Sequence, residues 1–93
     1  MVWRRVAEHA AWCPRDSMGK VVFGDRMWML GGFARGNRND VWSSADGVSW
    51  TGHQAPWPTR HEPGCLVHDG KLWFFGGYGN VLYNDVWVHE QPG

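Results

Sequence analysis

The stretch WMLGGFARGNRNDVW, residues 28–42, recurs 45 positions later as WFFGGYGNVLYNDVW, residues 73–87. The match extends to residues 12–44 against 57–89, where 11 of the 33 positions are identical. A fixed period of this length is typical of repeat architectures, in which each unit buries its apolar surface against neighbouring units. The repeat therefore limits the fold class before any single element is considered.

The eight tryptophans all take part in this repeat, so we interpret them mainly as framework residues. The 13 glycines and the many aromatic residues favour strands and turns, which predicts an all-β fold. The tryptophan pairs are Trp12 with Trp57, Trp28 with Trp73, Trp42 with Trp87 and, after a small length difference in one loop, Trp3 with Trp50.

Each unit divides into four short strands, here called a to d. Strands a and b are joined by a tight turn with hairpin chemistry. We expect the pairs Gly31-Gly32 and Gly76-Gly77 to end strand b, because the backbone there must approach closely or take positive φ. The predicted bounds are 19–23 and 64–68 for strand a, 27–30 and 71–75 for strand b, 40–44 and 85–89 for strand c, with strand d around Trp50 and Trp3.

This pattern resembles the kelch repeat. The likeness rests on the apolar strand before each Gly-Gly pair, on the repeated Asn-Asp-Val-Trp, and on the hairpin from Trp42 to Trp50, which is similar to bacterial kelch and galactose-oxidase-like propellers. The resemblance implies a kelch-type β-propeller with two four-stranded blades per chain. Repeat 1, residues 1–47, holds an N-terminal strand d and strands a–c of one blade. Repeat 2, residues 48–93, holds the strand d of that blade and strands a–c of the next.

Two blades alone leave two apolar faces open, which favours completion of a ring by further blades. Because both ends of the chain fall in one c–d hairpin, we expect strand d of one copy to complete the blade of the next, in a head-to-tail homo-oligomer. Two blades per copy permit only even rings, and we favour a six-bladed trimer over an eight-bladed tetramer. The residues expected to close the ring are Val2, Trp3, Val86, Trp87 and Val88.

The resemblance also implies that the d–a and b–c loops gather at the channel mouth and form a ligand-binding face. Arginines there suit carboxylates and phosphates, which predicts a small anionic ligand or an acidic peptide. The alternative for Arg15 and Arg60, which repeat, is a framework role in bonding loop carbonyls or carboxylates. Arg35 and Arg38 do not repeat and are the better functional candidates. The candidate ligand residues are Arg15, Arg35, Asn37, Arg38, Arg60, His61, Glu62, Tyr78, Asn80 and Tyr83.

The sequence contains no nucleophile–base pair, phosphate loop or paired-acid motif, so we expect no catalysis and no cofactor. The five histidines and two cysteines lack metal-ligand spacing, and we expect no metal and no disulfide. Zero formal charge argues against nucleic-acid and membrane-surface binding. No signal-peptide pattern or span of about 20 apolar residues is present, which favours a cytoplasmic location.

We therefore expect a non-catalytic, self-assembling propeller module. Such a module is either natural or an engineered or excised piece of a longer propeller. Two alternatives stay open. One is a natural lectin-like or acidic-ligand-binding propeller. The other is a sugar-directed enzyme of the sialic-acid mutarotase kind, which rests on the resemblance alone.

Overall fold

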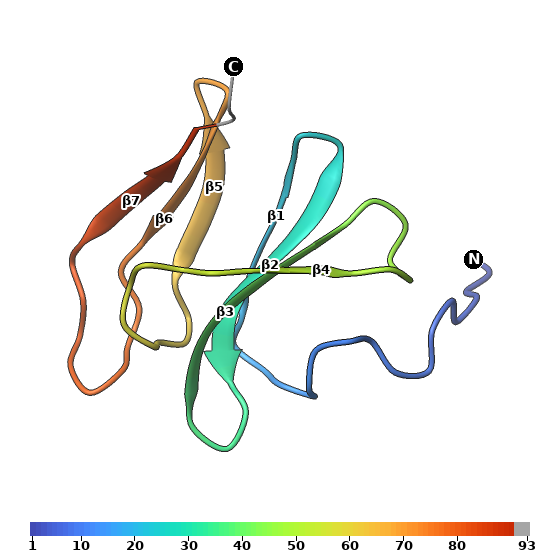
Figure 1. The fold of residues 1–93 in the computed structure, drawn as a ribbon, viewed down its shortest axis with the longest axis horizontal. Coiled ribbons are helices and arrows are strands. Elements are labelled where there is room, and N and C mark those ends of the chain that lie inside the picture. Colours follow the sequence, from blue (N-terminus) through green and yellow to red (C-terminus); the bar gives the residue numbers. More distant parts are fainter. Residues whose placement is uncertain (91–93) are drawn as a thin grey trace.

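The computed structural model describes residues 1–90, and these residues form seven β-strands and no helix. The strands make two antiparallel sheets, which confirms the all-β prediction (Figure 1). The first sheet has the order β1-β2-β3-β4 and the second has the order β5-β6-β7, so every strand pairs with the next along the chain. The bounds are β1 Gly19–Phe23, β2 Arg26–Phe33, β3 Asn37–Ser44, β4 Thr51–His53, β5 Gly64–His68, β6 Lys71–Phe75 and β7 Val86–His89.

Two-residue turns join the first two strands of each sheet. Gly24 and Asp25 lie between β1 and β2 with φ of 61° and 60°. Positive φ at both positions is typical of the type I′ turn, whose twist matches that of the flanking strands. Asp69 and Gly70 repeat this geometry between β5 and β6, with φ of 54° and 68°. The local turn chemistry explains why the predicted bounds of β1, β5 and β6 are confirmed.

The double glycine does not end the strand in the first sheet, and this part of the prediction is wrong. β2 continues through Gly31 and Gly32 to Phe33, because a β-bulge before Gly32 shifts its register against β3. Gly32 has a φ of 108°, and a Cβ there would lie 2.8 Å from the carbonyl oxygen of Asp16. Close approach of the preceding loop therefore requires glycine at this position. In the second sheet, β6 does end before the glycine pair.

The second sheet has three strands within the described chain, which agrees with the strands a to c predicted for the second unit. β4 pairs with β3 and covers the outer edge of the first sheet, whereas no strand of residues 1–90 covers the outer edge of β7. Within the single chain, residues 1–18 contribute only an isolated bridge at Asp16, and the strand predicted around Trp3, whose predicted partner is a neighbouring copy, is not formed. Residues 91–93 of the predicted junction lie outside the described residues.

The side-chain hydrogen bonds follow the 45-residue period. Three kinds of bond occur once in each sheet, so the two halves of the chain are built in the same way. They join Arg15 to Asp40 and Arg60 to Asp85, Trp42 to Asp40 and Trp87 to Asp85, and Trp28 to the Phe23 carbonyl and Trp73 to the His68 carbonyl.

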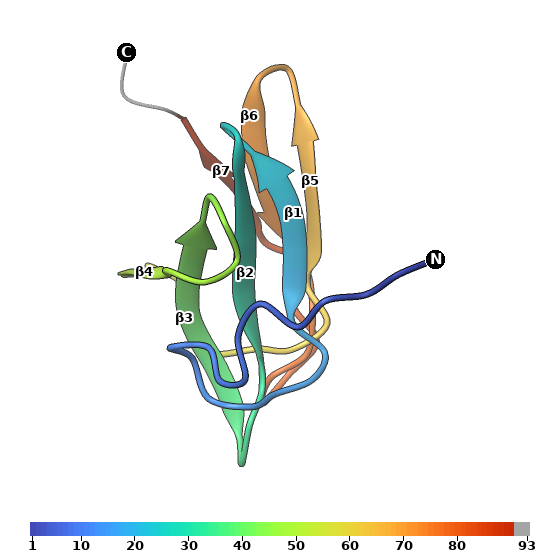
Figure 2. The same cartoon turned by 90° about the vertical axis from the view of Figure 1, so that its right-hand side faces the viewer.

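The two sheets pack together, with β1 of the first beside β5 of the second (Figures 1 and 2). Leu30 and Val41 of the first sheet share one buried cluster with Leu72 and Phe74 of the second. Trp57, in the connection between β4 and β5, stacks on Phe74 with ring centroids 3.9 Å apart. This contact between the sheets holds most of the buried core.

Each sheet also has a face that points away from the other sheet. Residues paired across a ladder share a face and successive residues alternate, so the strand registers assign these faces. On the outer face of the first sheet the large apolar residues are Val22, Met27, Met29 and Trp42, and they share this face with Lys20 and Ser44. On the outer face of the second sheet the large apolar residues are Leu66, Trp73, Phe75, Val86 and Val88, and they share this face with Gly64, His68 and Lys71.

Candidate functional site

The loops predicted to form a ligand face do lie together at one end of the molecule. Residues 16 and 33 exchange two backbone hydrogen bonds, and residues 61 and 78 exchange two more. The Arg60 backbone links the two sheets, because its carbonyl accepts from Gly32 and its N–H donates to Arg38. Glu62 donates its N–H to the Ser17 carbonyl. These bonds join loops from both sheets into one connected surface.

Arg15 and Arg60 are buried within this loop end. Their side chains are 1% and 0% exposed, and each makes a two-pronged ion pair with one carboxylate. Hydrogen bonds from Arg60 lower the pKa of Asp85 to about 2, and those from Arg15 lower the pKa of Asp40. Both guanidinium groups are paired with a carboxylate inside the chain, as the framework alternative expects.

Tyr83 also contributes to this framework. The Arg60 guanidinium carbon lies 4.0 Å from the centre of the Tyr83 ring and 5.3 Å from that of Phe74. A planar guanidinium stacks well on aromatic rings, so Tyr83 covers the ion pair between Arg60 and Asp85. The sequence analysis placed Tyr83 on the ligand face, whereas the structure shows it packed on Arg60.

His61 lies at the junction between the two sheets. Its Nδ1 is hydrogen-bonded to the side-chain amide of Asn37, at 2.5 Å from the amide oxygen. Its ring meets Phe33 and Tyr78 edge-on, with centroids 5.9 and 5.6 Å away. His61 and Asn37 thus hold the two b–c loops against each other.

The remaining loop candidates are exposed. Arg38 donates from Nε and Nη2 to the Ala34 carbonyl, which orders its loop. Arg35 is exposed, and in residues 1–90 it makes no ion pair. Anion binding at this surface stays a prediction. The other exposed candidates are Glu62, Tyr78 and Asn80.

The residues predicted to close a ring are divided between an exposed segment and an exposed strand. Val2 and Trp3 are 96% and 85% exposed. Val86 and Val88 are exposed on the outer face of the second sheet, while Trp87 points towards the first sheet beside Trp57, with ring centroids 5.9 Å apart. The structure therefore leaves four of these five side chains free for contacts outside the chain.

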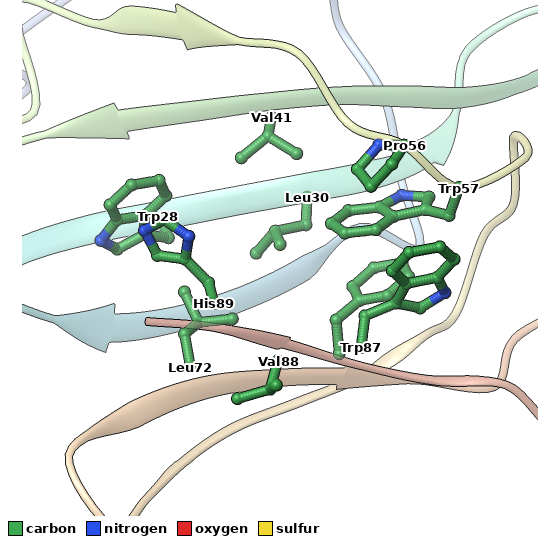
Figure 3. A pocket seen from close by; sticks show the side chains of 10 residues that line it. Trp28, Leu30, Val41, Pro56, Trp57, Leu72, Trp87, Val88 and His89 are labelled. Carbon is green, nitrogen blue, oxygen red and sulfur yellow. The ribbon is translucent and has the colours of Figure 1, made fainter. Parts of the chain in front are cut away.

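A cavity of about 160 Å³ lies between the two sheets (Figure 3). The sequence analysis missed it, because its wall combines β2, β3, β6 and β7, which only the packing of the sheets brings together. Aromatic and aliphatic side chains dominate the lining, and Figure 3 shows Leu30 of the first sheet and Trp87 of the second facing the space between the sheets, whereas the Val88 side chain points away from it. The lining residues are Trp28, Leu30, Val41, Pro56, Trp57, Leu72, Phe74, Trp87, Val88 and His89.

No protein-family model matches the chain, and no curated protein matches it in sequence. The kelch resemblance thus depends on the residues of the chain itself. Across residues 1–90 no group of three His, Cys, Asp or Glu side chains is placed to hold a metal ion. The same residues contain no helix able to cross a membrane.

Proposed function

We propose that the chain is a non-catalytic self-assembly module, whose two sheets are blades of a kelch-like propeller completed by further copies of the same chain. Copies associate head to tail, with the outer face of the second sheet of one copy against the outer face of the first sheet of the next. Three copies form a closed ring of six blades. The observation that carries this proposal is the internal packing of the two sheets.

The contact between the two sheets inside the chain predicts which faces meet in the contact between copies. Inside the chain, Trp28, Leu30 and Val41 of the first sheet meet the second sheet. Their counterparts 45 residues later are Trp73, Phe75 and Val86, which lie on the outer face of the second sheet. Repeats with the same face chemistry stack in the same way. The exposed face of the second sheet therefore has the chemistry needed to meet another first sheet.

The face of the second sheet that packs against the first sheet has a counterpart on the first sheet as well. Leu72, Phe74 and Trp87 of the second sheet receive the first sheet inside the chain. Their counterparts are Met27, Met29 and Trp42, on the outer face of the first sheet. Each pair keeps a large apolar or aromatic side chain. A second copy therefore finds the same kind of surface that the chain already buries internally.

Exposure of these faces supports association. Of the nine large apolar residues on the two outer faces, five are more than 40% exposed. They are Val22 at 68%, Met27 at 41%, Leu66 at 43%, Val86 at 62% and Val88 at 45%. Apolar side chains grouped on one face indicate an interaction surface, because water leaves such a surface at a gain of about 25 cal/mol per Å².

The edge of β7 supports the same arrangement. In the first sheet, β4 pairs with β3 over residues 41–43 and 51–53. The counterpart of β4 is residues 4–6, which follow Trp3 as β4 follows Trp50. Addition of residues 4–6 from a neighbouring copy gives β7 the partner that β3 already has. An uncovered strand edge otherwise offers unpaired N–H and C=O groups to other chains.

Sedimentation equilibrium of the whole chain tests the proposal. We expect a single species of about 32 kDa, three times the chain mass of 10.6 kDa. Leu66→Glu places a charge on the outer face of the second sheet and is expected to give a folded monomer. Val81→Glu is the matched control, because Val81 is 57% exposed but lies in a loop outside both outer faces.

Two results would contradict the proposal. If the wild-type chain stays folded and monomeric at 100 times the protein concentration used for sedimentation, self-assembly is excluded. A head-to-tail series without a defined mass excludes the closed ring, because a heterologous contact that does not close extends indefinitely.

A further inference from the structure

The cavity between the sheets has the size and chemistry of an aromatic side-chain site. Its volume is about 160 Å³, and its wall includes the rings of Trp28, Trp57, Phe74 and Trp87. An apolar cavity of about 150 Å³ remains dry and takes up a benzene-sized ring. The cavity is partly open to solvent, so an aromatic group from outside the chain can enter it and displace water from its apolar wall. The cavity is therefore suited to an aromatic group.

The matching position on the first sheet is already filled, by Trp50. Trp50 meets the ring of Trp12 edge-on, with centroids 5.6 Å apart, and donates its indole N–H to the Gly47 carbonyl at 3.1 Å. Trp50 also borders a shallow depression with Met27 and Met29 on the outer face of the first sheet. An indole thus packs over the first sheet at this point.

The repeat relates the surroundings of Trp50 to the wall of the cavity. Trp12, Met27 and Met29 have the counterparts Trp57, Leu72 and Phe74. All three counterparts line the cavity between the sheets. The second sheet consequently has the wall of an indole site, and within residues 1–90 no indole occupies it in the way that Trp50 occupies the first.

The sequence counterpart of Trp50 is Trp3. In the structure Trp3 is 85% exposed, and the segment that follows lies against the first sheet, where Val6 is the neighbour of Gly47 and lines a depression with Trp12 and Trp50. Figure 1 shows this segment on the side of the first sheet away from the second. The chain's own Trp3 is thus on the far side of the first sheet from the cavity.

We infer that Trp3 of a neighbouring copy inserts its indole into the cavity between the two sheets. This inference rests on the proposed head-to-tail assembly and names the site that receives the neighbour. The strand register agrees with it. The pairs Ser43 with Thr51 and Val41 with His53 become, in the second sheet, Val88 with Arg4 and Val86 with Val6 of the neighbour. Trp3 then precedes its strand by one residue, as Trp50 precedes β4.

The energetics favour a tryptophan at this position. Interface tryptophans that fill a well-packed pocket are the residues whose truncation weakens association most. Trp3 gains this burial only in the assembly, because it is 85% exposed in the single chain. Trp3→Ala therefore leaves the fold of each copy unchanged and removes a contact made between copies.

The experiment compares Trp3→Ala with Val2→Ala in the full chain. Val2 is the counterpart of Ser49, which is exposed on the first sheet, so Val2 is not expected to enter the cavity. Sedimentation should show a dissociation constant raised roughly thirty-fold or more for Trp3→Ala. The dissociation constant of Val2→Ala should stay within about threefold of the wild-type value.

Free indole provides the second readout. Calorimetry should show saturable binding of indole to the Trp3→Ala chain and no binding to the assembled wild-type chain, whose cavities are filled. Millimolar indole should also restore part of the assembly of Trp3→Ala, because the filled cavity supports the edge to which residues 4–6 add.

Three results would overturn the inference. Trp3→Ala assembling like the wild type, while Leu66→Glu is monomeric, leaves the assembly proposal intact and removes Trp3 from the cavity. Equal indole binding by assembled wild type and by Trp3→Ala shows a cavity that the neighbour does not fill. Absence of indole binding by Trp3→Ala shows that the cavity is not an indole site. A monomeric wild type, in contrast, contradicts the assembly proposal itself.

Discussion

Replacement of Arg60 by methionine tests the buried ion pair that anchors the loop end to the second sheet. The Arg60 side chain is fully buried, and its Nη2 donates to Asp85 at 2.8 Å while its Nη1 donates to the Gly76 carbonyl at 3.0 Å. Arg60→Met keeps much of the side-chain volume but leaves the Asp85 carboxylate without its cation. We expect a loss of stability, with no change in the strands.

The magnitude follows from the burial of the two partners. Removing one member of a buried ion pair costs about 3–5 kcal/mol. Asp85 keeps 34% of its side-chain surface exposed, so water compensates part of the lost interaction, and we expect about 3 kcal/mol. A chain of 93 residues has roughly 5–14 kcal/mol of net stability. The substitution therefore removes a large fraction of the stability of the chain.

Urea unfolding followed by far-ultraviolet circular dichroism measures this loss. With a slope of about 1.5 kcal/mol per molar urea, the midpoint should fall by roughly 2 M. The measurement is made in the Leu66→Glu chain, so that association adds nothing to stability. Arg15→Met is the matched control, since Arg15 makes the equivalent pair with Asp40 but stacks on neither Phe74 nor Tyr83, as Arg60 does.

We expect Arg15→Met to cost about 1 kcal/mol less than Arg60→Met, because a guanidinium over an aromatic ring contributes roughly 0.5–2 kcal/mol. Arg60→Lys keeps the charge but not the two-pronged geometry, so its loss should be intermediate. If the free energy of unfolding of Arg60→Met lies within 0.5 kcal/mol of that of its parent chain, the ion pair does not stabilise the fold. If Arg15→Met costs more than Arg60→Met, the assignment of stability to the aromatic contacts is wrong.

Two further predictions concern titratable groups. The pKa of Asp85 is lowered to about 2 in the folded chain from an ordinary value near 3.8, so its stabilising contribution is fully present above about pH 4 and is lost as the pH falls towards 2. The urea midpoint should therefore fall across this pH range in the wild type and fall less in Asp85→Asn. An equal fall of the midpoint in both chains would contradict the assignment. Burial raises the pKa of Cys65 to about 11, so only about 0.1% of Cys65 is thiolate at pH 8, while Cys13 is exposed. A thiol reagent should therefore modify Cys13 at least tenfold faster than Cys65, and Cys13→Ser should abolish the fast phase of modification. A fast phase that survives in Cys13→Ser would show that Cys65 is accessible to the reagent.

Local chemistry made several strands predictable. Turn residues with positive φ follow β1 and β5, and the predicted bounds of β1, β5 and β6 agree with the structure. The end of β2 was not predictable, because the bulge before Gly32 depends on the approach of a loop that is distant in sequence. The periodicity of the sequence predicts strands and turns from neighbouring residues, and it does not predict contacts between segments that are far apart in the chain.

The candidate site shows the same division. Arg15 and Arg60 were predicted as ligand residues, with a framework role as the alternative because they repeat, and the structure shows both in buried ion pairs. Tyr83 does not repeat, because Arg38 stands at the matching position, so the sequence offered no reason to pair it with Arg60. The cavity between the sheets could not be predicted from the sequence, in which the only related feature is the repetition of Trp12 as Trp57.

The sequence by itself determined the all-β class, the two units and the equivalence of positions 45 residues apart, because turn chemistry and periodic apolar residues act locally. Only the tertiary structure decided which face of each sheet is buried, where the loops meet and where a cavity remains. Those features depend on how two sheets fit together, and the packing of side chains from distant strands sets that fit. The stretch at residues 28–42 thus specifies one unit, whereas the space between this unit and its repeat specifies where a neighbouring Trp3 is proposed to bind.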